Sequence, residues 1–356
     1  MFINRSEICP VPAFQHNNVV ITMAASEAYA KYLFVLLESI RDNSNRNSNY
    51  DIIVLSDGIS LENKKALFNE IQQENLSVRF VEAGEWLENK KLYTAKHISR
   101  TTYLRLAAVD ILSAYDKTIY LDCDIVVNRD IAELFAYNIR DYMLAAVKDT
   151  VMRGWCCMQN SQGQLQRQYN REILNLSETH AYFNAGVMVM NLATFRAKGF
   201  HSQKLIELAT QKDWKWFDQD LLNSLCQDRV LYLDPRWNVM VHPFEFEWQM
   251  AEFHMPDEEY VSYWKNVVDP YVVHYAGQAL PVYDPTVERS DLFWRYARRT
   301  SRFGQLQNDM RRRIVNQFGE RSLIRKLADV FLPYGSKQRV IIRRLLGFNK
   351  RKKEYE

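Results

Sequence analysis

Glycine is scarce in this chain, with 11 among 356 residues. Many nucleotide-binding enzymes place a Gly-rich loop after their first buried strand, where the backbone of the loop holds a phosphate. The first apolar run here, residues 19–25, ends instead in Ala24, Ala25 and Ser26. This absence argues against an enzyme of that type.

Cysteines are few, and uninterrupted apolar stretches are short. The five cysteines are odd in number and lack metal-type spacing, so we expect reduced thiols in a cytosolic protein. They are Cys9, Cys123, Cys156, Cys157 and Cys226. Residues 1–12 contain no apolar run, so we expect no signal peptide. No stretch approaches 18 apolar residues, and we expect no membrane span.

The net charge of +3 hides an uneven distribution. Residues 286–356 hold 19 Lys and Arg against 7 Asp and Glu, a net of +12. The rest of the chain therefore has 27 basic and 36 acidic residues, a net of −9. We expect an acidic body over residues 1–285 and a basic, helical tail over residues 286–356, with different partners.

Apolar runs of strand type alternate with stretches of helical periodicity. We predict strands at residues 19–25, 50–56, 77–81, 119–121, 144–147, 182–192, 230–233 and 272–275. We predict helices at residues 27–41, 61–74, 97–112, 204–211 and 221–226, and a helical insertion or lid at 151–177. This alternation predicts an α/β fold with mainly parallel strands.

Two carboxylates, Asp122 and Asp124, lie at the carboxyl end of a predicted strand, where ligands bind in such folds. Because strand side chains alternate between faces, we expect both to point toward one ligand. Buried carboxylates are costly unless a cation holds them, so the pair predicts a divalent metal that bridges to substrate phosphates. The alternative is a solvated turn, the usual context of an isolated Asp-X-Asp.

Three further stretches follow this pair, namely Asn184-Ala185-Gly186, Asp218-Gln219-Asp220 and His274-Tyr275-Ala276-Gly277. Together with Asp122-Cys123-Asp124, their order resembles glycosyltransferase family 8 over roughly residues 18–300. Members are retaining enzymes that use nucleotide sugars, and they include bacterial lipopolysaccharide galactosyl- and glucosyltransferases. The resemblance implies a GT-A type, Rossmann-like domain with a mixed, mainly parallel central sheet.

The resemblance also implies which residues form the site. Asp122, Asp124 and His274 would hold Mn²⁺ or Mg²⁺, although a lone His at a strand end is more often structural. The nucleotide sugar would contact Ala24, Ser26, Lys96, Asp122, Cys123, Asp124, Asn184, Ala185, Gly186 and Gly277. The acceptor would contact Asp149 and Ala276, and a solvated strand end is the alternative for Asp149.

Asp218 and Gln219 would be the catalytic residues. Asp218 would hold sugar hydroxyls, and Gln219 would lie beneath the anomeric carbon. Double displacement needs a carboxylate at that place, whereas Gln219 is an amide. We therefore favour same-face substitution, with Asp218 as the alternative nucleophile.

The chain departs from the family pattern at the nucleotide. Ser26 stands where members usually have an Asp beside the base and ribose. Leu280 stands where a Lys usually contacts the diphosphate, and Lys96 or Arg100 could take its place. Uracil stays the expected base.

These features predict a metal-dependent hexosyltransferase that moves glucose or galactose from a UDP-sugar to a glycan or glycolipid, as in bacterial lipopolysaccharide synthesis. One alternative is a nucleotidyltransferase. The other is a non-catalytic protein that binds a glycan, or binds nucleic acid through the basic tail. The acidic body argues against nucleic acid, and we leave a homo-oligomer open.

The tail combines basic residues with apolar helical faces. The first such face comprises Leu323, Ile324, Leu327, Val330 and Phe331. A second basic segment, residues 339–353, repeats the scheme. We expect the tail to dock the enzyme on the anionic inner face of a membrane, near a lipid-linked acceptor. The alternative is that these faces pack on the catalytic domain or on a second subunit.

Overall fold

The computed structural model of the chain describes residues 9–92, 100–242, 255–277 and 279–315. The chain divides into a large compact unit, Met1–Gly304, and a small one, Gln305–Glu356. In the small unit, the described residues 305–315 are helical. The large unit contains the whole predicted site, and the following paragraphs concern it alone.

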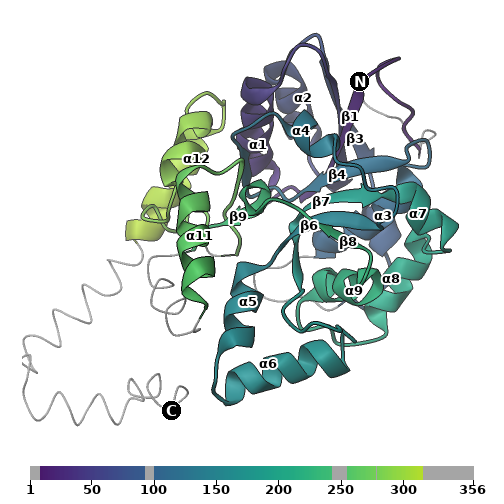
Figure 1. Ribbon diagram of the computed structural model, residues 1–356. Coiled ribbons are helices and arrows are strands. Elements are labelled where there is room, and N and C mark those ends of the chain that lie inside the picture. Colours follow the sequence, from purple (N-terminus) through teal and green to yellow (C-terminus); the bar gives the residue numbers. More distant parts are fainter. Residues whose placement is uncertain (1–8, 93–99, 243–254, 278, 316–356) are drawn as a thin grey trace, which may run out of the picture. The chain divides into compact units, whose positions relative to one another are not determined.

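A seven-stranded sheet in the order β3-β2-β1-β4-β7-β6-β8 forms the centre of this unit (Figure 1). The strands are β1 (Asn18–Ser26), β2 (Asn49–Asp57), β3 (Leu76–Glu82), β4 (Lys117–Leu121), β6 (Leu144–Lys148), β7 (Phe183–Asn191) and β8 (Val230–Tyr232). All neighbouring pairs are parallel except the two that β7 makes with β4 and β6. The predicted α/β fold with a mixed, mainly parallel sheet is confirmed.

The reversed direction of β7 places its amino end beside the carboxyl ends of the other strands. Leu121 at the end of β4 pairs with Val187 of β7. The residues just before Val187 therefore reach the edge of the sheet where Asp122 follows β4. This register brings Asn184 and Ala185 to the carboxylate pair, although more than sixty residues separate them in the sequence.

Helices cover both faces of the sheet, as near-continuous apolar strands require. Val20, Ile53 and Leu55 belong to a core shared with α3, α7, α8 and α9. Their neighbours Ile21, Ile52 and Val54 are buried on the opposite face, where α1 contacts β1. The helices are α1 (Ala30–Asn43), α2 (Leu61–Glu70), α3 (Leu104–Ile111), α4 (Ile131–Phe135), α5 (Thr150–Cys157), α6 (Ser161–Glu172), α7 (Leu192–Ala197), α8 (Ser202–Thr210), α9 (Phe217–Cys226), α11 (Asp257–Val268) and α12 (Ser290–Ala297).

A second sheet begins directly after the carboxylate pair. It contains β5 (Ile125–Val127), β10 (Val272–His274) and β9 (Val239–Met240), in the order β5-β10-β9. Residues 122–124 are not a strand but the connection between the two sheets. Strand alternation, which we expected to direct Asp122 and Asp124 to one ligand, therefore does not apply to them. The two carboxylates meet because the chain turns from one sheet into the other.

Most predicted elements occur within a few residues of their expected bounds. The insertion at 151–177 consists of α5 and α6, and α9 begins at Phe217, so that Asp218 and Asp220 lie in its first turn. A 3-10 turn, Arg100–Tyr103, precedes α3, and the start of the predicted helix at 97 lies outside the described residues. The sequence did not predict α4, α7, α11 or the separate strands β5 and β9. All five cysteines carry free thiols.

The large unit extends beyond residue 285 and includes α12. Asn43 of α1 donates a hydrogen bond from Nδ2 to the hydroxyl of Tyr296 in α12, at 2.9 Å. The predicted membrane-docking segments at 321–331 and 339–353 lie outside the described residues. Among the described residues, no helix combines the length and apolar character needed to cross a bilayer.

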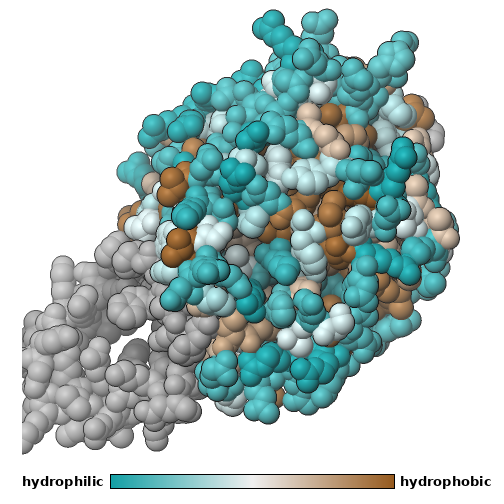
Figure 2. Space-filling view, viewed as in Figure 1, coloured by the Kyte–Doolittle hydropathy of each residue, from teal (hydrophilic) through white to brown (hydrophobic). Residues whose placement is uncertain are grey.

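On the face drawn in Figure 2, hydrophilic side chains cover most of the surface. Hydrophobic ones form small groups near its centre and at its margins.

Candidate active site

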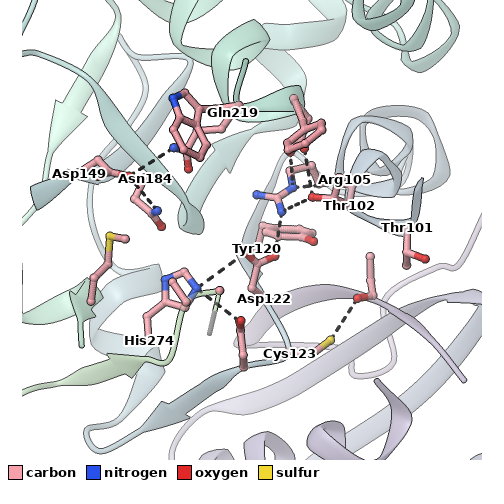
Figure 3. A pocket seen from close by; sticks show the side chains of 18 of the residues that line it. Thr101, Thr102, Arg105, Tyr120, Asp122, Cys123, Asp149, Asn184, Gln219 and His274 are labelled. Carbon is pink, nitrogen blue, oxygen red and sulfur yellow. Dashed lines mark hydrogen bonds and ion pairs between the residues drawn. The ribbon is translucent and has the colours of Figure 1, made fainter. Parts of the chain in front are cut away.

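A cavity of about 340 Å³ opens at the edge of the sheet where β1, β4 and β6 end and β7 begins. Its lining includes nearly all the described residues that the sequence assigned to the site (Figure 3). They are Ala24, Ser26, Asp122, Cys123, Asp124, Asp149, Asn184, Asp218, Gln219, His274, Ala276 and Gly277. Ala185 and Gly186 adjoin Asn184 in β7, and Lys96 lies outside the described residues.

Asp122, Asp124 and His274 form a cluster with metal-ligand chemistry. The Nε2 atom of His274 lies 3.4 Å from Oδ1 of Asp124 and 4.0 Å from Oδ2 of Asp122. One ligand atom from each residue lies within 4.8 Å of the other two. A His at the end of β10 thus meets the connection between β4 and β5. Two carboxylates and an imidazole are a donor set suited to Mn²⁺ or Mg²⁺.

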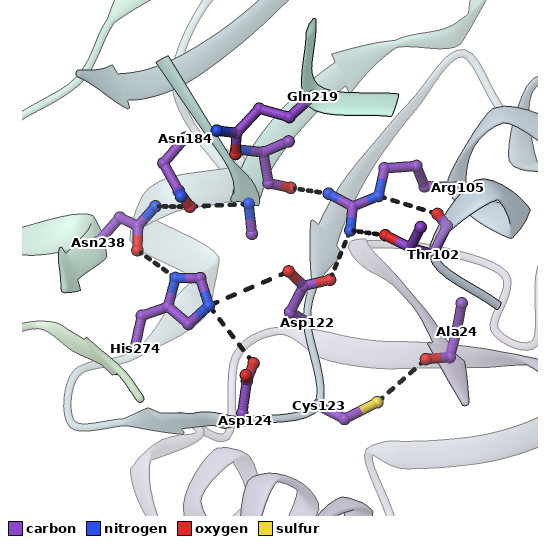
Figure 4. Close-up of polar contacts among 12 residues, drawn as sticks. Ala24, Thr102, Arg105, Asp122, Cys123, Asp124, Asn184, Gln219, Asn238 and His274 are labelled. Carbon is purple, nitrogen blue, oxygen red and sulfur yellow. Dashed lines mark hydrogen bonds and ion pairs between the residues drawn. The ribbon is translucent and has the colours of Figure 1, made fainter. Parts of the chain in front are cut away.

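Hydrogen bonds fix the orientation of His274 (Figure 4). The backbone N–H of Gly186 donates to Oδ1 of Asn184 at 2.9 Å, which makes that oxygen an acceptor. Asn238 therefore donates to it from Nδ2 at 2.9 Å, and presents its own Oδ1 to Nδ1 of His274 at 3.0 Å. An amide oxygen only accepts, so Nδ1 carries a proton. The lone pair of a neutral His274 then lies on Nε2 and faces the carboxylates.

This arrangement fits a cation between the three side chains. A lone pair facing carboxylate oxygens is repulsive unless a proton or a metal ion lies between them. Burial disfavours the charged imidazole, but Asp124 and Asp122 outweigh it and raise the pKa of His274. Space for the ring depends on Gly186, because a Cβ there would collide with Cε1 of His274.

Arg105 of α3 lies at the centre of the site and was not assigned from the sequence. Its guanidinium forms ion pairs with Asp122 at 2.9 Å and with Asp218 at 2.7 Å. It also donates to the carbonyl oxygen of Ala185, and it lies over the ring of Tyr120, with 4.5 Å between Cζ and the ring centroid. Arg105 is 4% exposed, so this buried cation offsets the buried carboxylate of Asp218 and the partly exposed one of Asp122.

Asp218 is a buried carboxylate at the amino end of α9. Burial raises its pKa to about 6 against the opposing effect of Arg105, and the neighbouring charge of Asp122 adds to the rise. Its Oδ1 accepts a hydrogen bond from Thr102 at 3.0 Å. The residue before it, Phe217, has φ 56°, a left-handed conformation that bulky residues rarely adopt. This strained turn directs Asp218 and Gln219 into the cavity.

Asp149 connects three elements, and it is buried rather than solvated. As the N-cap of α5 it accepts from the backbone N–H of Met152 at 2.9 Å. Its Oδ2 accepts from Nδ2 of Asn184 at 3.1 Å and from Nε2 of Gln219 at 3.3 Å. Gln219 in turn accepts from the backbone N–H of Ala185 at 2.8 Å. Asp149, expected at the acceptor, is therefore hydrogen-bonded directly to Asn184 and Gln219, which are expected at the donor sugar.

Small residues line the end of the cavity nearest to β1. These small residues are Ala24 and Ser26, and the aromatic ring of Tyr29 lies beside them. Gly277 has φ 66°, a conformation that glycine adopts without strain. Leu280 is fully buried and does not line the cavity, and Arg100 forms an ion pair with Asp57 at 2.8 Å.

Sequence reasoning missed several residues that line or support the cavity, among them Arg105, Asn238, Trp155 and Trp216. A signal existed for Arg105, because it is the one basic residue in the apolar helical stretch 103–109. Nothing in the sequence marks Asn238, which lies 36 residues from His274. Trp155 and Trp216 meet only through the packing of α5 against the start of α9.

The sequence profile of Glycosyl transferase family 8 matches residues 20–281. The chain is 27% identical over 228 residues to General stress protein A of Bacillus subtilis (strain 168), covering 62% of this chain and 74% of that protein. It is also 27% identical over 190 residues to lipopolysaccharide 1,2-glucosyltransferase of Escherichia coli (strain K12). That match covers 51% of this chain and 49% of the glucosyltransferase.

Solved structures show the same architecture. The bifunctional glycosyltransferase WbbM superposes with a TM-score of 0.73 at 28% identity, over 85% of this chain and 53% of that one. The galactosyltransferase LgtC, in complex with donor and acceptor sugar analogs, superposes with a TM-score of 0.63 at 26% identity. This match covers 80% of this chain and 96% of LgtC. The chain thus spans about half of WbbM and of the E. coli relative.

Proposed function

Because the chain belongs to glycosyl transferase family 8 and is a hexosyltransferase of the GT-A fold, we propose that it transfers glucose or galactose from a UDP-sugar with retention of the α configuration. The acceptor is a glycan or glycolipid of the bacterial cell surface. The observation that carries this proposal is the cluster of Asp122, Asp124 and His274, in which the Nε2 lone pair of His274 faces two carboxylates.

Asp122, Asp124 and His274 are the residues that would hold Mn²⁺ or Mg²⁺. Such an ion would supply Lewis-acid stabilisation of the charge that develops on the departing phosphate oxygen. The chain provides the rest of the donor site. Ala24, Ser26 and Gly277 leave space for the nucleoside and allow the backbone to approach the phosphates.

The donor hexose lies between Arg105, Asp218 and Asn184 in this proposal. Asp218 accepts hydrogen bonds from sugar hydroxyls, and Arg105 keeps it oriented through their ion pair. Gln219, in the first turn of α9, lies next to the anomeric carbon in this proposal. One structural neighbour is an active-site mutant of LgtC in which glutamate replaces a glutamine. This supports a glutamine, here Gln219, at the reacting centre.

Same-face substitution accounts for retention with these side chains. Gln219 already accepts from Ala185 and donates to Asp149, so its amide is held as a positioning group and not as a nucleophile. Asp218 is paired with Arg105, which weakens it as a nucleophile. The acceptor oxygen forms its bond to the anomeric carbon as the bond to the phosphate oxygen breaks. The proton of the acceptor hydroxyl passes to that phosphate oxygen.

A nucleotide-sugar panel tests the proposed function. The purified chain is incubated with Mn²⁺, with UDP-, GDP-, ADP- or CMP-sugars and with lactose or maltose as the acceptor, and the released nucleotide and the product configuration are measured by NMR. We expect turnover of UDP-glucose or UDP-galactose and α-linked products. A β-linked product contradicts the proposal. So does turnover of nucleotides that carry no sugar, which is the result expected of a nucleotidyltransferase.

We further propose that the basic tail docks the enzyme on the anionic inner face of a membrane, close to a lipid-linked acceptor. The net charge of +12 over residues 286–356 supports this, since each Lys or Arg near an anionic surface contributes about 1 kcal/mol. The similarity to a lipopolysaccharide glucosyltransferase also supports it.

Truncation after Gly304 tests the membrane role. The shortened protein should no longer bind anionic liposomes, and should still hydrolyse donor slowly. Equal liposome binding by both proteins, or by neither at any salt concentration, contradicts it. If truncation instead changes the subunit count in solution, the tail serves a homo-oligomer.

A further inference from the structure

Two tryptophans that take no part in the chemistry proposed above line the same cavity. Trp155 lies in α5, and Trp216 directly precedes α9. Their ring centroids are 5.3 Å apart, and their planes are inclined by 34°. Both side chains are half-buried, so part of each remains accessible from the cavity. An indole ring presents a flat apolar face with partial negative charge, which attracts C–H groups.

This aromatic wall is attached to the residues at the reacting centre. Asp149 caps the helix that carries Trp155, and Gln219 lies in the first turn of the helix that follows Trp216. The hydrogen bond from Gln219 to Asp149 joins the two helices at that point. Val151, Met152 and Trp155 all line the cavity from α5. The wall therefore starts at the reacting centre and continues along α5 and α9.

Lys215 holds the two rings in place. Its Nζ lies 5.5 Å from the ring centroid of Trp155 and 5.9 Å from that of Trp216, within the range of cation–π attraction. The same ammonium donates to Oε1 of Gln166 in α6 at 2.6 Å. Tyr169 of α6 lies behind the cluster, 5.7 Å from Lys215 Nζ. A surface ordered in this way loses little entropy when a ligand binds.

The place of the wall in the sheet order indicates which part of the substrates it meets. Ala24 and Ser26, the small residues suited to the nucleoside, lie at the carboxyl end of β1. The wall belongs to α5, which follows β6, and to α9, which contacts β7. In the order β1-β4-β7-β6, these lie on the opposite side of the carboxylate pair from the nucleoside end. The acceptor must approach from this side, where Asp149 lies.

We propose that Trp155 and Trp216 form a second acceptor subsite, which stacks the sugar ring next to the one that receives the hexose. A pyranose has an apolar face of C–H groups and a polar rim of hydroxyls, which matches a flat indole wall beside polar groups. The proposal rests on the proposed function and extends it. The natural acceptor is then an oligosaccharide of at least two sugars, and a single sugar binds less tightly.

Direct binding tests this without depending on turnover. The full chain is titrated by calorimetry, with UDP and Mn²⁺ present, with methyl glucoside and methyl galactoside and with maltose, lactose and gentiobiose. We expect at least one disaccharide to bind about 10-fold more tightly than its methyl glycoside, the gain typical of a well-placed aromatic contact. Trp155→Ala should remove this difference and leave the Kd values for the methyl glycosides and UDP unchanged.

A matched control is Trp264→Ala in α11, which removes a half-buried tryptophan that packs on Tyr263 outside the cavity. It should leave the disaccharide preference intact. Trp216→Phe, which keeps an aromatic face, should retain most of it and serves if an alanine variant does not fold. No disaccharide preference in the wild type, or an unchanged preference in Trp155→Ala, overturns the subsite.

The outcomes separate this proposal from the proposed function. A disaccharide preference without any turnover of UDP-sugars supports the subsite and contradicts the transferase activity. Turnover of UDP-sugars without a disaccharide preference supports the transferase activity and contradicts the subsite. A loss of UDP binding in Trp155→Ala would place the nucleobase on the wall and overturn the subsite.

Discussion

The two ends of the cavity are held in place in different ways. At the metal end, backbone hydrogen bonds hold the connection between two sheets: Asp122 N–H donates to Gly186 O at 2.8 Å, and Tyr275 N–H donates to Asp124 O at 2.9 Å. Asn238 adds one side-chain bond, which orients His274. At the acceptor end, Asp149 and Gln219 lie at the starts of two helices and are joined through side chains. The two ends therefore differ in what joins their elements: backbone bonds between sheets at one end, and side-chain bonds between helices at the other.

Arg105 connects the two ends, because it pairs with Asp122 on one side and with Asp218 on the other. Substitutions at the metal end should therefore reduce donor hydrolysis and transfer alike. Those in the aromatic wall of Trp155 and Trp216 should affect transfer alone.

Asp124→Ala should lower kcat by roughly 1,000-fold, since the several kcal/mol of charge stabilisation from a bound ion would be lost. Donor hydrolysis should fall with transfer, as measured by UDP release with and without acceptor. The midpoint of thermal unfolding should not fall, because the substitution removes one of two neighbouring carboxylates and with it their charge repulsion. Wild type in excess chelator is the control, and full activity in either sample would refute the metal site.

Arg105→Met should destabilise the fold by about 3–5 kcal/mol, because Asp122 and Asp218 would lose their buried cation. Urea unfolding measures this loss. The matched control is Arg100→Met, whose guanidinium is half exposed and pairs with Asp57, and which should cost less than about 1 kcal/mol. Equal losses in the two variants would show that Arg105 does not link the two ends.

The sequence predicted the metal end better than the acceptor end, for a physical reason. Asp122 and Asp124 follow an apolar run, and the small Ala276-Gly277 follows His274, so the local pattern indicated each piece. Even there, the reason given for the convergence of the two carboxylates was wrong. The turn from one sheet into another depends on the pairing of β5 with β10, which lies almost 150 residues away.

The acceptor end depends on contacts that leave no local pattern. Trp155 and Trp216 are 61 residues apart, and only the packing of α5 near the start of α9 brings them together. At the metal end, the bond from Asn238 to His274 is of the same kind, because it joins side chains of separate elements. Position 217 has a left-handed backbone, but it is occupied by Phe and not by the glycine or asparagine that would have marked the turn in the sequence. The main sheet, by contrast, followed from the alternation of apolar strands with helices.

The pH dependence of stability should report on Asp218. Its pKa is about 6 in the folded chain against the ordinary value of 3.8. Between these values the folded chain holds a proton that the unfolded chain has lost. The contribution to stability is therefore present below about pH 4 and is lost as pH rises through 6.

Relative to Asp218→Asn, the wild type in chelator should lose up to roughly 3 kcal/mol of unfolding free energy between pH 4 and pH 7. Urea unfolding at several pH values measures the difference. A difference that stays flat over this range would mean that Asp218 is already ionised at pH 4, and that Arg105 outweighs burial.

Asn238→Ala should weaken Mn²⁺ binding by about 10- to 100-fold, the usual effect of losing a group that orients a His ligand. Titration followed by electron paramagnetic resonance measures this without any turnover. Asn238→Asp, which keeps an acceptor for Nδ1–H, should bind the ion more tightly than the Ala variant. If both variants bind Mn²⁺ as the wild type does, His274 does not need this partner.

The smallest effect is expected at Cys123, although it lies between the two carboxylates. Its thiol donates to the carbonyl oxygen of Ala24 at 3.1 Å. Burial, and then Asp122 and Asp124, raise its pKa, so it stays a thiol and offers no thiolate to an ion.

Cys123→Ala should therefore cost about 1 kcal/mol of stability for one hydrogen bond, with less than about a 3-fold change in kcat/KM. Cys123→Ser keeps the donor and should restore the stability. A large loss of Mn²⁺ affinity in Cys123→Ala would contradict this, and would show that the metal end depends on side-chain packing as the acceptor end does.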